Sequence, residues 1–431
     1  MFTPKLPWNK SYSKADFRDD FFAGMTTGVM LIPQAMAYAL LAGLSVEVGL
    51  YASTIPIFVY AFMGSARSLA VGPVAMDSLL SAAAVGAVAL SHPAVSETEK
   101  TMMAALLAFM VGIVLVVMGL LKMGRLVSLL TPIIISAFTS AAALIIGINQ
   151  LKLILGIDLV KSSKVYVIVG DVFAKIGTTH LTTLILGVVA IGLLLALKKF
   201  APKVPRAFVV VGLGVMAVLL GDLGAEGVKL VGAVPQGLPA FSTPWMDWSI
   251  VAELVPHAFI IALVAFMEAI SISTKLKKEN EELDPSRELV ALGTANLSSG
   301  LFQGYSVTGG LSRSAVNDAA GAKSQVAALI TGIMVVLTLS FFSGVLANIP
   351  KAVLGAIIMT AVFGLISIKD AKAVFTTHKQ DLPVYAITFL VTLFVGIKEG
   401  LIAGVLVNWL INRNKAGTEV TENVEAQQEG A

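Results

Sequence analysis

The sequence predicts an all-α polytopic membrane protein. Of its 431 residues, 57% are hydrophobic and only 13% are charged, and this charged share is about half that of an average soluble domain. A membrane-spanning helix needs about 20 mostly apolar residues, and the chain divides into apolar runs of this order between short polar breaks. The composition excludes a soluble enzyme and a nucleic-acid binder as descriptions of the whole chain. The lack of Cys excludes a secreted disulfide scaffold.

Both ends of the chain are polar. Residues 1–20 mix basic and acidic side chains without a signal-peptide pattern, so we expect a cytoplasmic arm there. Residues 412–431 are polar and lack a long apolar run, which is typical of a short disordered tail.

Fourteen candidate spans lie between these ends, with edges defined only to within several residues. The first seven cover 21–43, 47–63, 73–90, 101–121, 127–149, 181–197 and 207–221. After a polar, Pro-rich stretch at 228–248, the second seven cover 250–272, 286–302, 312–321, 325–349, 352–366, 382–397 and 399–411. The division into seven plus seven predicts a repeated architecture.

The distribution of basic residues supports this even number of spans. With the N-terminus inside the cell, 21 of the 30 Lys and Arg residues fall on the cytoplasmic side, as the positive-inside rule requires. We therefore expect both termini to be cytoplasmic, in the inner (plasma) membrane of the cell.

The third and tenth spans are abnormal. Each follows a segment rich in Gly, Ser and Thr, at Gly64–Gly72 and at Gly304–Gly310. Non-helical backbone at membrane depth is tolerated only where protein or a wet cavity surrounds it. We expect two half-helices preceded by short extended segments, the first starting with Pro73 in its first turn and the second capped by Ser312 or Ser314.

Two half-helices at corresponding positions are the pattern of an inverted-repeat transporter. Their first N–H groups have no intrahelical partner, and the helix dipole is positive at that end. Two such N-termini that meet near the bilayer midplane would form a site for an anion.

Several separated motifs resemble those of the sulfate permease (SulP) family of anion transporters, and the match runs from about residue 16 to 411. In the first half they are Pro33-Gln34-Ala35-Met36-Ala37-Tyr38-Ala39, Leu41-Ala42-Gly43-Leu44, Gly49-Leu50-Tyr51, Gly64-Ser65-Ala66-Arg67 and Val71-Gly72-Pro73-Val74-Ala75. In the second half they are Glu268-Ala269-Ile270-Ser271 and Gly309-Gly310-Leu311-Ser312-Arg313-Ser314-Ala315-Val316-Asn317.

The resemblance implies a fold of two intertwined inverted repeats of seven helices. A core (transport) domain, at 21–122 and 250–349, would move against a gate domain at 123–224 and 350–411. Members of the family usually continue into a cytoplasmic STAS domain, which we expect to be absent here. Either the chain is a naturally short member or it is truncated.

The resemblance also indicates where the substrate binds. Gln34 and Tyr38 are four residues apart on the first span and share a face, which the family pattern directs to the substrate. Val74, Ala75 and Leu311 match positions at the mouths of the half-helices. The alternatives are that Gln34 hydrogen-bonds a neighbouring helix and that the apolar side chains only pack.

Polar and charged residues complete the predicted site. The Ser312 hydroxyl either contacts the anion or caps its helix. Arg313 is placed near the midplane, where a charge costs at least about 2.5 to 3.5 kcal/mol, and Glu268 is its expected partner, either in a static ion pair or as a coupling residue. Asp77, one turn into the first half-helix, is the reserve coupling residue, with capping or packing as the alternative.

The predicted function is secondary active transport of small anions (sulfate, bicarbonate or a carboxylate such as a dicarboxylate) by alternating access. Protons, or alternatively sodium, would be the coupled ion. The alternatives are an anion channel or exchanger, and a nucleobase:proton symporter of the same architecture. An intramembrane protease would need catalytic residues in the spans that the sequence lacks.

The remaining partners of the chain are few. The lipid bilayer is one, and a second copy is another, since Gly24 and Gly28 form a small-xxx-small face; packing within one chain is the favoured interpretation of that face. We expect no metal and no organic cofactor, because the four histidines are never spaced as a metal-binding pair.

Overall fold

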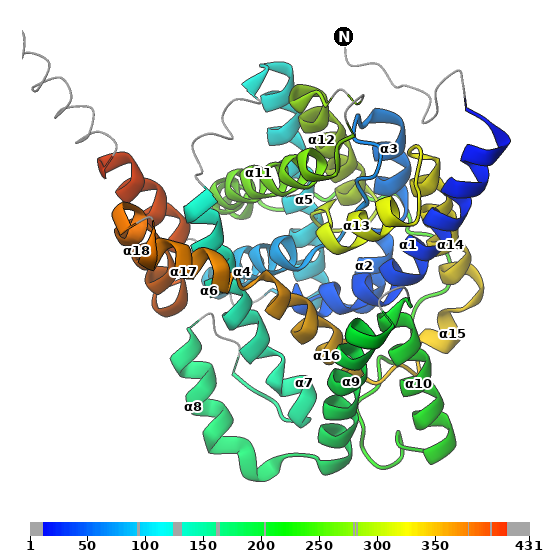
Figure 1. The fold of residues 1–431 in the computed structure, drawn as a ribbon. Coiled ribbons are helices and arrows are strands. Elements are labelled where there is room, and N and C mark those ends of the chain that lie inside the picture. The colour runs from blue at the N-terminus through cyan, green and yellow to red at the C-terminus, as the bar shows by residue number, and fades with distance from the viewer. Residues whose placement is uncertain are drawn as a thin grey trace, which may run out of the picture. The chain divides into compact units, whose positions relative to one another are not determined.

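The computed structural model describes residues 12–92, 95–123, 132–160, 164–201, 204–278, 281, 283–377, 379–396 and 399–411. Almost all regular structure in them is helical, with two strands of two residues each (Figure 1). The chain divides into two compact units. The first comprises Met1–Val127, Asn149–Leu159 and Asp171–Ala361, and the second comprises Ser128–Ile148, Val160–Gly170 and Val362–Ala431.

The first unit contains most of the helices. In the first half of the chain they are α1 (Lys14–Leu41), α2 (Val46–Tyr51), α3 (Ile55–Met63), α4 (Ala75–Ser91), α5 (Glu97–Leu120), α7 (Leu151–Leu155), α9 (Leu181–Phe200) and α10 (Arg206–Gly221). In the second half they are α11 (Trp248–Leu276), α12 (Pro285–Leu301), α13 (Leu311–Ala319), α14 (Val326–Phe341), α15 (Ser343–Leu346) and most of α16 (Lys351–Val362).

Glycines let α5 and α12 approach each other closely in this unit. A methyl group at Gly112 of α5 would lie 2.6 Å from the Leu297 backbone nitrogen, and one at Gly293 of α12 would lie 2.7 Å from that of Val116. Small residues at such contacts are typical of helices packed in membranes. The α5–α12 pair is a central contact of the first unit.

Helix α1 packs beside α14 in the same way (Figure 1). A methyl group at Gly28 would lie 2.7 Å from the Met334 sulfur, and Thr331 Oγ1 donates a hydrogen bond to the Gly24 carbonyl oxygen at 2.9 Å. The small face of α1 is therefore used within one chain, as the favoured interpretation of its glycines predicted.

The second unit has its own small core. It contains α6 (Pro132–Asn149) except its last residue, the first part of α8 (Val165–Lys175), α17 (Ile368–Thr376), α18 (Leu382–Phe394) and a last helix, Glu399–Ile411. Buried Ala137, Val374 and Tyr385 form a hydrophobic cluster. Ser136 Oγ donates to Asp370 Oδ2 at 2.9 Å and ties α6 to α17.

A helix lies at each of the fourteen positions where the sequence predicts a span. Among the described residues, seven helices are long and apolar enough to cross a membrane. The count of fourteen crossings and the inverted repeat stay predictions. Helix α8 was not predicted, because its eleven residues carry an Asp171–Lys175 ion pair and form no long apolar run. The predicted tail at 412–431 and residues 1–11 of the arm lie outside the described residues.

Candidate functional site

Two short strands join the halves of the first unit. Strand β1 (Val71–Gly72) pairs antiparallel with β2 (Thr308–Gly309), so that Val71 faces Gly309 and Gly72 faces Thr308. The Gly310 N–H extends the pairing by donating to the Ala70 carbonyl oxygen at 3.0 Å. The extended segments predicted before the third and tenth spans are thus present, and each leads directly into a helix.

The helices that follow the strands begin without a side-chain cap. Helix α4 starts at Ala75 after the N-cap residue Val74, and α13 starts at Leu311 after the N-cap residue Gly310. Neither N-cap side chain bonds to the backbone N–H groups of the first turn. Because the two strands pair with each other, the first N–H groups of both helices lie beside the same strand pair.

Two expectations about these helix starts are wrong. Pro73 is not in the first turn of α4, because the paired strand keeps the chain extended until Val74. Ser312 and Ser314 do not cap α13. The Ser314 hydroxyl accepts a hydrogen bond from the Ala70 N–H at 2.9 Å, so it stabilises the crossing of the strands, and Ser312 is exposed.

Arg313 is buried at this crossing. Its side chain is 1% exposed, and Nη1 donates to Gln34 Oε1 on α1 at 3.4 Å. Among the residues that the structure describes, its Nε and Nη2 have no hydrogen-bond partner. The guanidinium lies against Gly310, where a methyl group would come 2.7 Å from its Cζ atom, and Gly72 lies on its other flank. The guanidinium therefore has donors to spare.

The expected ion pair between Arg313 and Glu268 does not form. Among the described residues, no carboxylate lies within 4.0 Å of the Arg313 guanidinium. The guanidinium is turned towards Gln34, whereas Glu268 of α11 lies close enough to Asp77 for the two carboxyl groups to repel each other. Tyr38 interacts electrostatically with both Arg313 and Glu268.

The other predicted site residues fall into two classes. Gln34, Tyr38, Val74 and Ala75 are buried. Leu311 is 45% exposed, and Ser312 next to it is exposed as well. A hollow beside Arg313 has a volume of about 10 Å³, room for about one water molecule. A hollow of this volume does not hold an oxyanion, whereas Leu311 and Ser312 at the start of α13 are exposed.

Asp77 does not cap α4, although it is the third residue of that helix. Its side chain is fully buried, and Oδ2 lies 3.2 Å from Ser306 Oγ in the segment before β2. Its other oxygen, Oδ1, has no hydrogen-bond partner. The capping alternative for Asp77 is therefore wrong, because the side chain turns away from the helix start.

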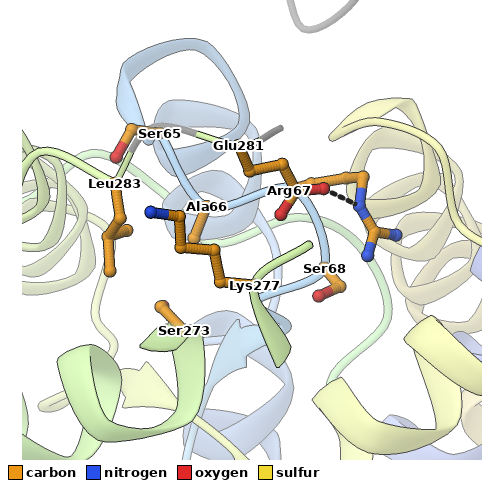
Figure 2. A pocket seen from close by; sticks show the side chains of 8 residues that line it. All are labelled: Ser65, Ala66, Arg67, Ser68, Ser273, Lys277, Glu281 and Leu283. Atoms are coloured by element: carbon orange, nitrogen blue, oxygen red, sulfur yellow. Dashed lines mark hydrogen bonds and ion pairs between the residues drawn. The ribbon is translucent and has the colours of Figure 1, made fainter. Parts of the chain in front are cut away.

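A second hollow lies at the other end of the segment that leads into β1 (Figure 2). Arg67 is central to it: Nε donates to Glu281 Oε1 at 2.5 Å and Nη2 to Asp318 Oδ1 at 2.5 Å. Lys277 and Ser273 line it from the end of α11. Because Asp318 belongs to α13, Arg67 ties the far end of that helix to the segments before β1 and α12.

Two buried carboxylates were missed in the sequence. Glu288 on α12 accepts hydrogen bonds from the Tyr60 hydroxyl (2.6 Å) and from the Ser65 and Ala66 N–H groups (2.5 and 3.0 Å). Asp20 on α1 accepts bonds from the Lys323 and Ser324 N–H groups (2.6 and 3.1 Å). Each lies near the edge of a predicted span, where a charged side chain is usually exposed to water. No local sequence pattern distinguishes these two buried residues from exposed ones.

Comparison with known proteins identifies the family. The model of the sulfate permease family matches residues 17–388. The chain belongs to the sulfate permease family. It is a member of a transport family and not of an enzyme family, and the predicted resemblance is confirmed.

Plants and bacteria contain relatives of this chain. It is 38% identical over 410 residues to sulfate transporter 4.1 of Arabidopsis thaliana, a chloroplastic protein, covering 93% of this chain and 59% of the relative. A probable sulfate transporter of Mycobacterium tuberculosis is 31% identical over 402 residues, covering 93% of this chain and 71% of the relative. The chain thus spans between about three fifths and seven tenths of the length of these relatives.

Solved structures share its fold. The murine Slc26a9 anion transporter in the inward-facing state matches with a TM-score of 0.89 at 26% identity, over 96% of this chain and 71% of that one. The transmembrane domain of the cyanobacterial bicarbonate transporter BicA matches with a TM-score of 0.79 at 22% identity, over 95% of this chain and 99% of that one. The chain is therefore an all-helical multi-pass membrane protein, as its composition predicted.

Proposed function

We propose that this permease carries small anions across a membrane as a secondary active transporter that works by alternating access. The observation that supports this most directly is the β1–β2 pair, which brings two uncapped helix N-termini to one place beside a buried arginine with unpartnered donors. The bound anion would lie between the starts of α4 and α13, in contact with Ser312 and within the field of Arg313.

The charge balance at this place favours an anion. Each helix start carries roughly half a positive charge, and Arg313 adds a full one without a carboxylate at ion-pair distance. Burying such a charge in the membrane costs at least about 2.5 to 3.5 kcal/mol. A bound anion would offset this cost, whereas a neutral or cationic solute would not.

Sulfate is the proposed first substrate. Its oxygens can accept hydrogen bonds from two helix starts at once, and two relatives of this chain are named as sulfate transporters or probable ones. Bicarbonate and dicarboxylates offer the same acceptor chemistry and are the next candidates. Gln34 would act by holding Arg313, and Tyr38, Val74, Ala75 and Leu311 would shape the walls of the site.

Transport would require movement of one part of the chain against another. We propose that the core, at 21–122 and 250–349, moves relative to a gate at 123–224 and 350–411. Fourteen spans with both termini in the cytoplasm of a plasma-membrane protein fit the distribution of basic residues. Each elementary charge moved inward against the membrane potential costs about 2.3 kcal/mol per 100 mV, so net accumulation of an anion requires a coupled cation, which we propose to be the proton.

Uptake by proteoliposomes tests this function. We expect saturable uptake of labelled sulfate that increases with an inward proton gradient and is competed by bicarbonate or a dicarboxylate but not by uracil. Uptake driven equally well by a sodium gradient at fixed pH would overturn the proton assignment. Non-saturable anion flux would indicate a channel, strict dependence on internal anion an exchanger, and uracil uptake without anion competition a nucleobase symporter.

A further inference from the structure

One histidine joins three segments of the first unit. His180 is the N-cap residue of α9, and its backbone N–H donates to the Leu155 carbonyl oxygen at the end of α7 at 3.0 Å. Its ring nitrogen Nε2 lies 3.0 Å from the carbonyl oxygen of Glu226 in the loop after α10. Gly156 lies against it, since a methyl group there would come 3.0 Å from the His180 Cβ atom. The start of α9 is therefore joined to α7 and to the loop after α10 at this residue.

The hydrogen-bond partners determine which ring nitrogen of His180 carries a proton. A carbonyl oxygen can only accept, so Nε2 must bear a hydrogen to bond with Glu226. On the other side of the ring, Nδ1 lies 3.3 Å from the backbone nitrogen of Thr183, whose N–H can only donate. Nδ1 must therefore present a lone pair, which also accepts from the Thr183 hydroxyl group at 2.8 Å. The ring is neutral, with its single proton on Nε2.

A histidine cap differs from the serine caps of α1 and α5 in its response to acid. The hydroxyl oxygens of Ser13 and Ser96 accept hydrogen bonds at any ordinary pH. A histidine ring takes up a second proton at about pH 6.5 in model peptides, and Nδ1 then has no lone pair. An N–H on Nδ1 would oppose the Thr183 N–H, donor to donor, at the positive end of the helix dipole. A protonated ring therefore cannot cap α9.

We propose that His180 is a pH-sensitive latch, which holds the start of α9 when its ring is neutral and releases it when the ring is protonated. The bond from Nε2 to Glu226 remains available to the charged ring, because Nε2 is a donor in both states. The ring is rigid, so it can leave the Thr183 N–H only by turning relative to α9. The first turn of α9 would then lose its cap, and its contact with the loop after α10 would open.

Within the described part of the chain, no ion pair would hold a protonated His180 in place, because no carboxylate lies within 4.0 Å of its ring nitrogens. Asp158 Oδ1 accepts from Lys229 Nζ at 2.7 Å. Lys175 Nζ donates to the Asp158 carbonyl oxygen at 2.9 Å and to Asp171 Oδ2 at 3.0 Å. The other charged groups on the surrounding segments are Lys152, Asp222 and Glu226, whose carboxylate lies 3.4 Å from the Thr182 hydroxyl group. The ring is therefore held by its two hydrogen-bonding partners.

The latch lies on the outer side of the membrane in the predicted topology. His180 follows the fifth predicted span and Glu226 follows the seventh, and these odd-numbered spans end outside if the N-terminus is cytoplasmic. His180 is partly exposed, so its ring can exchange protons with that side. External acid would loosen the start of α9, a helix of the proposed gate at 123–224. This consequence rests on the proposed function, whereas the latch itself does not.

Hydrogen–deuterium exchange of the purified protein, measured by mass spectrometry, tests the latch without any transport. After correction for the intrinsic pH dependence of exchange, protection around Thr183 should fall about fivefold from about pH 7.5 to about pH 5.5. This factor corresponds to roughly 1 kcal/mol, the usual contribution of an N-cap. In His180→Asn, whose amide oxygen can cap α9 at either pH, protection should not change. Equal protection of the wild type at both pH values, or an equal loss in His180→Asn, would overturn the proposal.

His92 provides the matched control. Its Nδ1 lies 3.1 Å from the Val88 carbonyl oxygen at the end of α4, so this nitrogen donates, and protonation of the other ring nitrogen leaves the bond intact. His92→Gln should leave the low-pH loss of protection around Thr183 unchanged. If that loss disappears in His92→Gln, the titrating group is not His180, and the proposal is wrong.

Nitrogen-15 NMR tests the tautomer directly and does not require His180 to be replaced. A His92→Gln/His257→Gln/His378→Gln variant retains His180 as its single histidine. Labelled at histidine, it should show the Nε2–H tautomer at neutral pH, because Nδ1 accepts from Thr183. An Nδ1–H tautomer would overturn the proposal whatever the exchange experiment shows.

Sulfate uptake by proteoliposomes tests the consequence for the gate. The rates of the wild type and of His180→Asn should coincide above about pH 7 and diverge as the external pH falls below about 6.5. Coincident rates over the whole range would overturn the role in the gate. Lack of saturable uptake by both proteins would overturn the proposed function alone, because the exchange and NMR results do not depend on transport.

Discussion

Two kinds of helix start occur in this protein. Helices α1 and α5 begin with complete capping boxes. Ser13 accepts from the Asp16 N–H at 3.2 Å while Asp16 accepts from the Ser13 N–H at 2.8 Å, and Ser96 and Glu99 form the same pair. Helices α4 and α13 have Val74 and Gly310 as their N-cap residues, and these provide no side-chain cap.

The difference shows how a helix start becomes available for a ligand. A capping box satisfies the N–H groups that helix geometry leaves without partners, so an anion gains little there. At α4 and α13 those groups begin beside a strand pair, next to a buried Arg313. The sequence has Ser at the N-cap and an acidic residue three positions later where α1 and α5 start among charged residues. It has Val or Gly at the N-cap where the two half-helices start beside each other.

The largest effect is expected from giving α13 a cap of its own. Gly310 has φ −93° and ψ 118°, a conformation that an N-cap Asp adopts readily. In Gly310→Asp the added Cβ would displace the Arg313 guanidinium, whose Cζ lies 2.7 Å from its position. The carboxylate would then accept from the N–H groups of α13 and form a charge-assisted bond with the displaced Arg313. We expect sulfate affinity to fall by more than about 100-fold, which corresponds to roughly 2.7 kcal/mol, in a filter-binding or uptake assay.

Gly86→Ala is the matched control for that variant. Gly86 lies within α4, where a methyl group would meet nothing within 4 Å. Helix propensity would favour Ala by up to about 1 kcal/mol, so affinity should stay at the wild-type value. Full sulfate affinity in a correctly folded Gly310→Asp protein would show that the start of α13 does not bind the anion.

A smaller effect is expected from removing single polar groups beside the uncapped starts. Gln34→Ala removes the hydrogen-bond partner of Arg313, and Ser312→Ala removes an exposed hydroxyl at the start of α13. Each loss should weaken sulfate binding by roughly 1 to 3 kcal/mol, which is about fivefold to 150-fold. Titration of initial uptake rates measures it, and unchanged affinity in both variants would place the anion elsewhere.

Removing a cap from a capped start should act on stability and not on binding. Ser96→Ala breaks the capping box of α5 and should lower the free energy of unfolding by about 1 kcal/mol. Thermal unfolding of detergent-solubilised protein measures this loss. Sulfate affinity should not change, and a decrease in affinity equal to that of Ser312→Ala would remove the distinction between the two kinds of start.

The smallest effect is a pH dependence of the capped starts. Hydrogen bonds from the Ser13 backbone and hydroxyl group lower the pKa of Asp16, and those from Ser96 lower the pKa of Glu99. A carboxyl group with a lowered pKa stabilises the fold above its ordinary pKa of about 4 and loses this contribution as pH falls through the folded value. The temperature midpoint of unfolding should therefore decrease as the pH is lowered from about 5 to about 3. The decrease should be smaller in a Ser13→Ala/Ser96→Ala variant.

Some side-chain partners could not be predicted from spacing alone. Arg313 was expected to pair with Glu268, since both are charges placed deep in the spans. The structure instead directs Arg313 to Gln34 and leaves Glu268 near Asp77. Which charges meet depends on how each helix is rotated about its axis. The rotation is set by contacts such as Gly28 with Met334, which lie about 300 residues apart.

The sequence by itself determined the class of this protein, the positions of the helices at its fourteen predicted spans, the two extended segments before the half-helices and the family to which it belongs. These properties depend on local composition and on motifs of adjacent residues, which a single chain displays directly. Only the tertiary structure decided that Val74 and Gly310 are the N-cap residues of the half-helices, that Gly310 lies against the Arg313 guanidinium, and that Asp77 faces Ser306. Those properties arise because the β1–β2 pair aligns segments more than 200 residues apart, and no local pattern specifies that alignment.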